Sequence, residues 1–301
     1  KEVLLMVFLR IVVFMFLIFP SFSYSQSVES LNFDWRYSVG EVDGAENPDF
    51  DDSDWQLVNL PHDASISGAF VDDEAKGGIK RNGFRPRNIG WYRKAFFMKD
   101  VPIDERIILE FEGVYRHAKV WLNGQYVGEY LNGYLDFEFD ITKHVKSGKN
   151  ILSVRYDNTH ISSRWYTGEG IYRHVWLKRK NLVSVARYGQ QITSTRDQQG
   201  RAYVEVKTTV RNDSDEIKSV KVITQIKNSS GKAISEKVAV IPINAKDHTA
   251  FVQYFTLEEP ALWSVQHPNL YHSDSKIVVD GARVDSYQNR FGIRDIHFNP
   301  E

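Results

Sequence analysis

The sequence predicts an all-β protein made of two consecutive β-sandwiches. Apolar residues recur at every second position in short segments such as 107–111 and 202–210. This is the period of half-buried strands. Turn-forming residues separate these segments, most clearly the pair Asn123-Gly124. No long stretch carries the helical period, so we expect no helix beyond a few turns in either sandwich.

The composition excludes several classes of protein. With 301 residues the chain is long enough for two ordinary domains with substantial cores. The formal charge is -1 and no long basic segment occurs, so the sequence gives no electrostatic support for a nucleic-acid partner. Cysteine is absent, which excludes disulfides and thiolate metal sites. No feature of the sequence calls for a cofactor.

The first residues have the order of a secretory signal peptide. Lys1 and Arg10 precede the apolar segment 11–19, which small residues follow, and cleavage is expected after Ser25. We therefore predict that residues 1–25 are removed and that the protein is exported, periplasmic or extracellular. A membrane anchor is the alternative, but the uninterrupted apolar segment is short for a bilayer. After cleavage no membrane association is expected.

The first sandwich is predicted over residues 26–182. In the segment 135–141 apolar residues alternate with acidic ones, which is typical of a strand with one solvated face. Asn123-Gly124 predicts a two-residue hairpin, because both residues tolerate the positive φ of a type I′ turn. The strand pattern restarts for a second sandwich over 183–290. About seven strands in roughly a hundred residues is the size of an immunoglobulin-like domain.

Residues 49–54 contain four aspartates and allow two interpretations. Alternating Asp oxygens suit a hard cation such as calcium. Alternatively, Asp and Ser cap a short helical turn in front of Trp55 by accepting from backbone N–H groups. The segment lacks the Gly and the closing Glu of the EF-hand spacing. The structural interpretation is therefore favoured, and no metal site is predicted.

The segment 163–173 is the strongest candidate for binding. Gly168 and Gly170 give backbone freedom on either side of Glu169, and Arg164 and Trp165 lie just before them. Aromatic faces cover the apolar side of a pyranose ring, and charged ends hydrogen-bond its hydroxyls. The alternative is that the aromatic residues only close one end of the sandwich.

Several short motifs together resemble glycoside hydrolase family 2, which includes β-galactosidases, β-glucuronidases and β-mannosidases. They occur in the expected order and are Leu-Pro-His-Asp at 60–63, Gly-Trp-Tyr-Arg at 90–93, Val-Trp-Leu-Asn-Gly at 120–124 and Gly-Ile-Tyr-Arg at 170–173. The resemblance implies that 26–182 is a galactose-binding-like jelly roll that binds sugar. It also implies that 183–290 is the immunoglobulin-like second domain.

The resemblance further implies that 291–301 leads into a catalytic (β/α)₈ barrel absent from this sequence. Both catalytic glutamates of the family lie in that barrel, so we name no catalytic residue here and expect this chain alone to be inactive. A retaining, β-galactosidase-like glycosidase is the implied activity of the full-length protein. The implied partners are a carbohydrate substrate and the protein's own barrel, while a homo-oligomer stays an open alternative.

One residue departs from the family pattern. Relatives place a sugar-binding Asp where this chain has Arg164. A donor replaces an acceptor, so this sugar contact does not carry over unchanged and galactose specificity does not follow from the resemblance. Neither the sugar nor its linkage can be read from the sequence. We predict that Arg164, Trp165 and Glu169 contribute to substrate binding, with Glu169 shaping the loop or touching the ligand. The alternative function is a stand-alone carbohydrate-binding or adhesive protein of two sandwiches.

Overall fold

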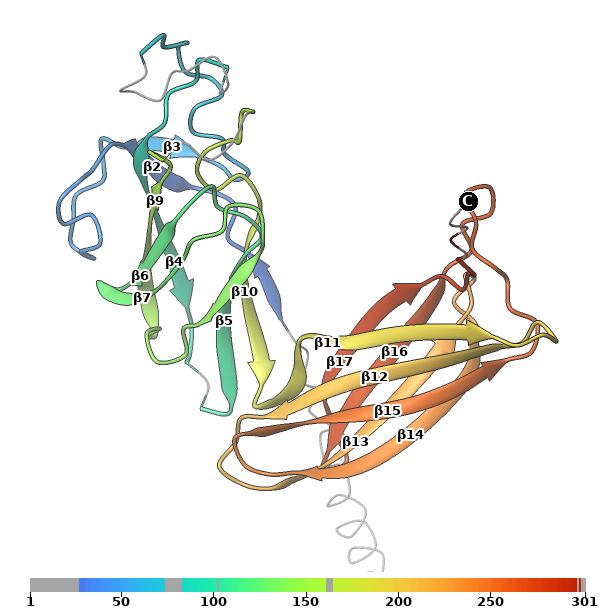
Figure 1. Ribbon diagram of the computed structural model, residues 1–301. Coiled ribbons are helices and arrows are strands. Elements are labelled where there is room, and N and C mark those ends of the chain that lie inside the picture. Colours follow the sequence, from blue (N-terminus) through green and yellow to red (C-terminus); the bar gives the residue numbers. More distant parts are fainter. Residues whose placement is uncertain (1–26, 74–82, 102, 161–164, 297, 299–301) are drawn as a thin grey trace, which may run out of the picture. The chain divides into compact units, whose positions relative to one another are not determined.

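The computed structural model describes residues 27–73, 83–101, 103–160, 165–296 and 298 (Figure 1). These residues form β-strands, turns and loops, and no helix among them is long and apolar enough to cross a membrane. The chain divides into two compact units, Gln26–Asn181 and Leu182–Glu301, which we describe separately. The predicted signal peptide 1–25 and the predicted sugar ligand Arg164 lie outside the described residues.

The first unit consists of two antiparallel sheets (Figure 1). The six-stranded sheet has the order β3 (Gln56–Val58), β2 (Trp35–Val39), β4 (Ile89–Met98), β9 (Gly148–Asp157), β6 (Ala118–Leu122) and β7 (Gln125–Tyr130). The four-stranded sheet has the order β1 (Val28–Ser30), β10 (Val175–Asn181), β5 (Glu105–Phe111) and β8 (Phe137–Asp140). Most neighbours in these sheets are distant in sequence, so long-range pairing positions the loops between them.

The core of the first unit is formed by the alternating residues that the sequence pattern identified. Ile107, Leu109 and Phe111 of β5 are fully buried, as are Val154 and Tyr156 of β9. Their side chains belong to one hydrophobic cluster that draws on both sheets. Burial of each such side chain contributes about 1.5–3 kcal/mol. The strand period therefore determines which face of each sheet turns inward.

The predicted hairpin at Asn123-Gly124 is confirmed. The two residues connect β6 to β7 and have φ values of 53° and 80°. Both values lie in the left-handed region that a type I′ turn requires. The Asn123 side chain also donates to the His144 carbonyl oxygen at 2.9 Å, which ties the hairpin to a neighbouring loop.

One of the four aspartates in 49–54, Asp52, pairs with a buried cation, whereas Asp49, Asp51 and Asp54 are exposed. Arg93 of β4 is 2% exposed, and its Nε donates to Asp52 Oδ2 at 2.7 Å. Its Nη1 donates to the carbonyl oxygens of Ala45 and Asn47. Asp51 accepts from the backbone N–H of Ser53, as expected for a capped turn. Among the described residues, no group of three or more His, Asp or Glu side chains could hold a metal ion.

The second unit is a seven-stranded antiparallel sandwich, the strand number of a constant-type immunoglobulin domain (Figure 1). One sheet has the order β11 (Val183–Arg196), β12 (Ala202–Asn212) and β15 (Asp247–Leu257). The other has the order β14 (Ala233–Ile243), β13 (Lys218–Lys227), β16 (Tyr271–Val279) and β17 (Ala282–Phe291). The predicted all-β fold of two sandwiches is thus confirmed.

The segment after β17 is attached to the second unit. Ile293 is fully buried, and its carbonyl oxygen accepts from the Trp263 N–H at 2.8 Å. The Arg294 guanidinium lies 5.0 Å from the centroid of the Trp263 ring. At Gly292 a Cβ atom would collide with the Trp263 side chain, so this position requires glycine. Residues 291–294 are therefore packed on the sandwich.

Candidate sugar-binding site

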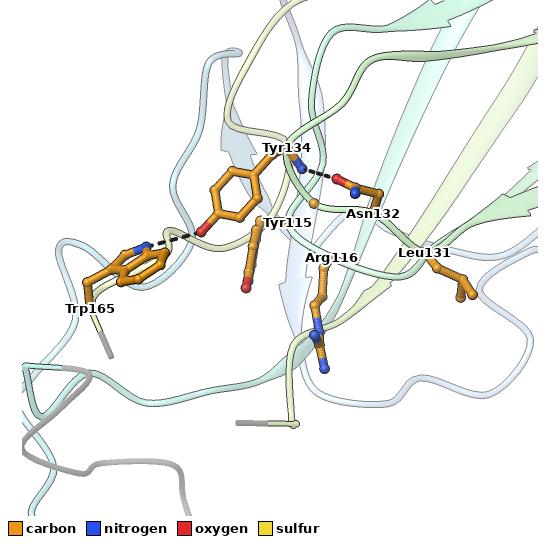
Figure 2. A pocket seen from close by; sticks show the side chains of 7 residues that line it. Tyr115, Arg116, Leu131, Asn132, Tyr134 and Trp165 are labelled. Atoms are coloured by element: carbon orange, nitrogen blue, oxygen red, sulfur yellow. Dashed lines mark hydrogen bonds between the residues drawn. The ribbon is translucent and has the colours of Figure 1, made fainter. Parts of the chain in front are cut away.

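A hollow of about 490 Å³ lies at one end of the first unit (Figure 2). Three loops form it, namely those that connect β5 to β6, β7 to β8 and β9 to β10. The residues that line it are Tyr115, Arg116, Leu131, Asn132, Gly133, Tyr134 and Trp165. Its volume falls within the range of small-ligand sites, about 300–1,000 Å³. The lining combines aromatic rings, one cation and one amide.

Trp165 and Tyr134 form one wall of the hollow. The Trp165 indole N–H donates to the Tyr134 hydroxyl at 3.2 Å, and Figure 2 shows the two rings side by side. The Tyr115 ring lies 5.2 Å from the Tyr134 ring, centroid to centroid. Trp165 is 59% exposed, although aromatic residues of this size usually bury more of their surface. An exposed ring at the edge of a hollow is a suitable surface for the C–H face of a sugar.

Backbone contacts hold these loops in register. Tyr115 and Gly170 exchange two hydrogen bonds, at 2.9 and 2.7 Å, which join the β5–β6 loop to the β9–β10 loop. Gly170 has a φ of 87°, and a Cβ there would overlap the Tyr92 hydroxyl. Gly133 packs directly on the Tyr115 ring, and its carbonyl oxygen accepts from the Tyr172 hydroxyl at 2.7 Å. Glycine at these two positions allows the loops to approach closely.

Glu169 lies beneath the loops and is fully buried. Its Oε1 accepts from the Asn88 side chain at 3.0 Å and from the Tyr156 hydroxyl at 2.9 Å. Its Oε2 accepts from the Asn88 backbone N–H at 2.9 Å and from Asn158 Nδ2 at 3.0 Å. The carboxylate therefore connects the β9–β10 loop to residues from β9 and from the segment before β4. All four donors are neutral.

Burial dominates the titration behaviour around Glu169. Loss of solvent raises the pKa of Glu169, and the four hydrogen bonds lower it by less. Burial also raises the pKa values of Tyr156 and Tyr92 well above their usual range, so both phenols stay protonated. Burial lowers the pKa of His62, whose Nδ1 lies 2.7 Å from the Tyr92 hydroxyl. The centre of the unit is a hydrogen-bonded network rather than a set of acid–base groups.

His62 and Asp63 are neighbours in the sequence but have separate partners. His62 contacts Tyr92, whereas Asp63 Oδ1 accepts from the Tyr166 hydroxyl at 2.6 Å. The Tyr166 hydroxyl also lies 2.9 Å from Ser65 Oγ. Tyr166, the neighbour of Trp165, is thereby turned inward, away from the exposed position that Trp165 occupies.

The structure places the predicted site residues in different environments. Trp165 lines the hollow, and Glu169 is buried behind the loop with each oxygen accepting two hydrogen bonds. Of the two roles that the sequence left open for Glu169, this geometry favours shaping the loop. Sequence reasoning missed Tyr115, Arg116 and Tyr134, because no local signal indicates that their loops meet the loop of Trp165.

The described lining of the hollow offers groups that can contact a sugar rather than a pair of carboxylates. Hydrolysis by this class of chemistry needs two carboxyl groups facing each other across the scissile bond. None of the described residues that line the hollow carries a carboxylate. The aromatic rings and the donors of Arg116 and Asn132 can instead cover a sugar face and hydrogen-bond hydroxyls or anionic groups.

Comparison with known families identifies the class of protein. The model described as "Glycosyl hydrolases family 2, sugar binding domain" matches residues 28–181. The model described as "Glycosyl hydrolases family 2" matches residues 188–294. The chain therefore belongs to glycosyl hydrolase family 2, which confirms the resemblance seen in the sequence. Its two sandwiches are the non-catalytic sugar-binding and immunoglobulin-like domains of this family.

Individual relatives agree with this assignment. The chain is 34% identical to the β-galactosidase BoGH2A of Bacteroides ovatus over 87% of its length and 31% of the relative. It is 30% identical to a putative β-glucuronidase of Formosa agariphila, covering 92% of this chain and 26% of the relative. A family 2 member from Bacteroides cellulosilyticus has a similar solved structure, with a TM-score of 0.83 at 30% identity, over 90% of this chain and 36% of that one. The chain thus spans about a third of these relatives.

Proposed function

We propose that this chain is the N-terminal, non-catalytic part of an exported β-glycosidase that hydrolyses O-glycosidic bonds of a carbohydrate. The observation that carries the proposal is the succession of the two family 2 domain matches, over 28–181 and 188–294. The relatives extend well beyond the matched part, and relatives with this arrangement bear the names β-galactosidase and β-glucuronidase. A retaining mechanism with both catalytic glutamates downstream of this chain is part of the proposal.

In this proposal the hollow contributes to the substrate site. Trp165 supplies an exposed aromatic face, and Tyr134 and Tyr115 extend it. Arg164 directly precedes Trp165 in the sequence, and we propose that it also contacts the sugar. Glu169 acts from behind by fixing the loop, because its carboxylate is buried and hydrogen-bonded on both oxygens. The sandwich thereby shapes a site whose chemistry is performed elsewhere in the protein.

The test compares the full-length protein with the 301-residue chain on nitrophenyl β-galactoside and β-glucuronide. We expect turnover by the full-length protein and none by this chain, because the hollow has no carboxylate pair. Hydrolysis by the shorter chain would overturn the proposal. A full-length protein that binds saccharides but hydrolyses none would favour the alternative, a stand-alone carbohydrate-binding protein.

Export is tested separately. Mass spectrometry of the mature protein from periplasmic or culture fractions should find Gln26 as its first residue, since the apolar segment precedes Ser25 in the order of a signal peptide. A protein that retains residues 1–25 and stays inside the cell would contradict export. This result would leave the proposed glycosidase function untouched.

A further inference from the structure

We propose that the saccharide which occupies the hollow is anionic and that Arg116 binds its carboxylate or sulfate group. This inference rests on the proposed function, because it assumes that the hollow accepts a sugar. It starts from the guanidinium of Arg116, which lies among the lining residues. Figure 2 shows its side chain extending beside that of Tyr115 and away from the Tyr134 ring.

Arg116 differs in its partners from three other arginines of the first unit. Arg93, Arg106 and Arg155 each form an ion pair with a carboxylate of Asp52, Asp140 and Glu41, respectively. The guanidinium of Arg116 has neither an acidic partner nor a carbonyl acceptor among the described residues. Its backbone carbonyl oxygen accepts a hydrogen bond from the N–H of Asp157 at 2.9 Å. The backbone is thus anchored while the charge remains available.

Three other charged groups, Arg87, Glu169 and Asp157, lie near this part of the first unit. Arg87, a second cation within electrostatic range, is 5% exposed and donates through Nη1 to the His160 carbonyl oxygen at 2.6 Å. Its Nε and Nη2 have no hydrogen-bond partner among the described residues. Glu169 is the acid that acts on Arg87, but its carboxylate is enclosed by four neutral donors. Asp157 instead faces Arg155 and Thr159. Among the described residues that line the hollow, Arg116 has the one charged side chain, so the charge carried by this lining is positive.

A planar guanidinium forms paired hydrogen bonds with carboxylate and sulfate oxygens, which neutral hydroxyls cannot match in strength. The aromatic wall of Trp165 and Tyr134 covers the apolar face of a sugar ring at the same time. A uronic acid and a sulfated sugar both combine these two features. The shared chemistry of the ligand is therefore a pyranose that carries one negative charge.

The experiment measures binding of three matched probes to the full-length protein by isothermal titration calorimetry. The probes are a thio-linked β-galactobioside, which resists hydrolysis, and two counterparts in which a C6 group is a carboxylate or a sulfate ester. The variants are Arg116→Gln, which removes the charge at similar size, and Arg116→Lys, which keeps the charge but lacks the paired N–H donors of a guanidinium.

Lys149→Gln serves as the matched control, because it removes the same charge from an exposed side chain of β9. It lies eight residues from Asp157 along the strand, or about 26 Å at the usual strand rise of about 3.3 Å. A general effect of net charge would appear in this variant as well as in Arg116→Gln. A local effect would appear in Arg116→Gln alone.

We expect the wild-type protein to bind at least one anionic probe about ten- to a hundredfold more tightly than the neutral probe. Arg116→Gln should bring this ratio close to one, and Arg116→Lys should retain part of it. Comparison of the carboxylate and sulfate probes then identifies the anion.

Equal affinities for all three probes, unchanged in Arg116→Gln, would overturn the inference while leaving the sugar site intact. An equal loss in Lys149→Gln would also overturn it, since the effect would then belong to the net charge. Binding of none of the probes would remove both the inference and the hollow as a sugar site. Hydrolysis of aryl glycosides tests the enzyme independently of these outcomes.

Discussion

Removal of the Glu169 carboxylate should destabilise the first unit strongly. In Glu169→Ala the donors on Asn88, Tyr156 and Asn158 lose their acceptor in a buried place. Each buried donor left without an acceptor costs about 1–3 kcal/mol. Water entering the new cavity recovers part of this cost. We therefore expect the free energy of unfolding to fall by about 3–5 kcal/mol, a large share of a typical domain's 5–15 kcal/mol.

Glu169→Gln should cost less, about 1–3 kcal/mol, because one amide oxygen still accepts two of the four hydrogen bonds. This variant also replaces the titratable carboxyl group by an amide that does not ionise. Burial raises the folded pKa of Glu169 above its ordinary value of 4.5, so the folded state binds this proton more tightly. The stability that the proton confers is complete below pH 4.5 and is lost as the pH rises through the folded pKa. The wild type should therefore exceed Glu169→Gln by more at acidic pH than at neutral pH.

The assay is urea unfolding followed by tryptophan fluorescence at both pH values. Of the seven tryptophans, all but Trp263 lie in the first unit, so the signal reports mainly on that unit. Glu129→Gln, an exposed carboxylate on β7, is the control and should change the unfolding free energy by less than about 1 kcal/mol. If both substitutions of Glu169 also stay below about 0.5 kcal/mol, the buried carboxylate does not hold the loops and the reasoning fails.

Three further predictions address other parts of the first unit. Arg93→Met should lower the free energy of unfolding by about 3–5 kcal/mol, because Asp52 and several carbonyl oxygens lose a buried cation. Urea unfolding measures this change, and a loss below about 1 kcal/mol would contradict the prediction. Trp165→Ala should weaken saccharide binding about tenfold and leave the free energy of unfolding nearly unchanged, since the ring is 59% exposed. Calorimetry measures the binding and urea unfolding measures the stability. A loss of stability with unchanged binding would show a structural role. Burial lowers the pKa of His62 in the folded state below its ordinary value of 6.5. The stability contributed by the neutral imidazole is therefore complete above pH 6.5 and declines as the pH falls through the folded pKa. His62→Gln should therefore unfold less steeply with acid between about pH 7 and pH 5 in pH-dependent unfolding, and an unchanged slope would refute this.

Much of the fold could be predicted because the strand period is a local property. Alternation of apolar residues in 107–111 and 202–210 identified β5 and β12 and their inward faces. Asn123-Gly124 identified the hairpin, since positive φ is a property of the residues themselves. The family motifs were equally readable, because each is a short contiguous segment. The segment 135–141 was predicted as one strand, whereas β8 spans only Phe137–Asp140 and Leu135 is exposed.

The candidate site depended on the tertiary structure. Trp165 was identified from its loop, but Tyr115, Arg116 and Tyr134 come from two other loops that meet it only after both sheets have paired. The role of Glu169 was open in the sequence, since an acidic residue between two glycines is as consistent with ligand contact as with a structural role. Its partners Asn88, Tyr156 and Asn158 lie up to 81 residues away, and their convergence buries the carboxylate.

The sequence by itself determined the all-β class, the succession of two sandwiches and the family, because periodicity and contiguous motifs record them residue by residue. The tertiary structure alone decided which charges are neutralised. Asp52 pairs with the buried Arg93, whereas the Arg116 side chain lines a hollow. Electrostatic interactions depend on distance and solvent exposure, and neither can be derived from positions along the chain.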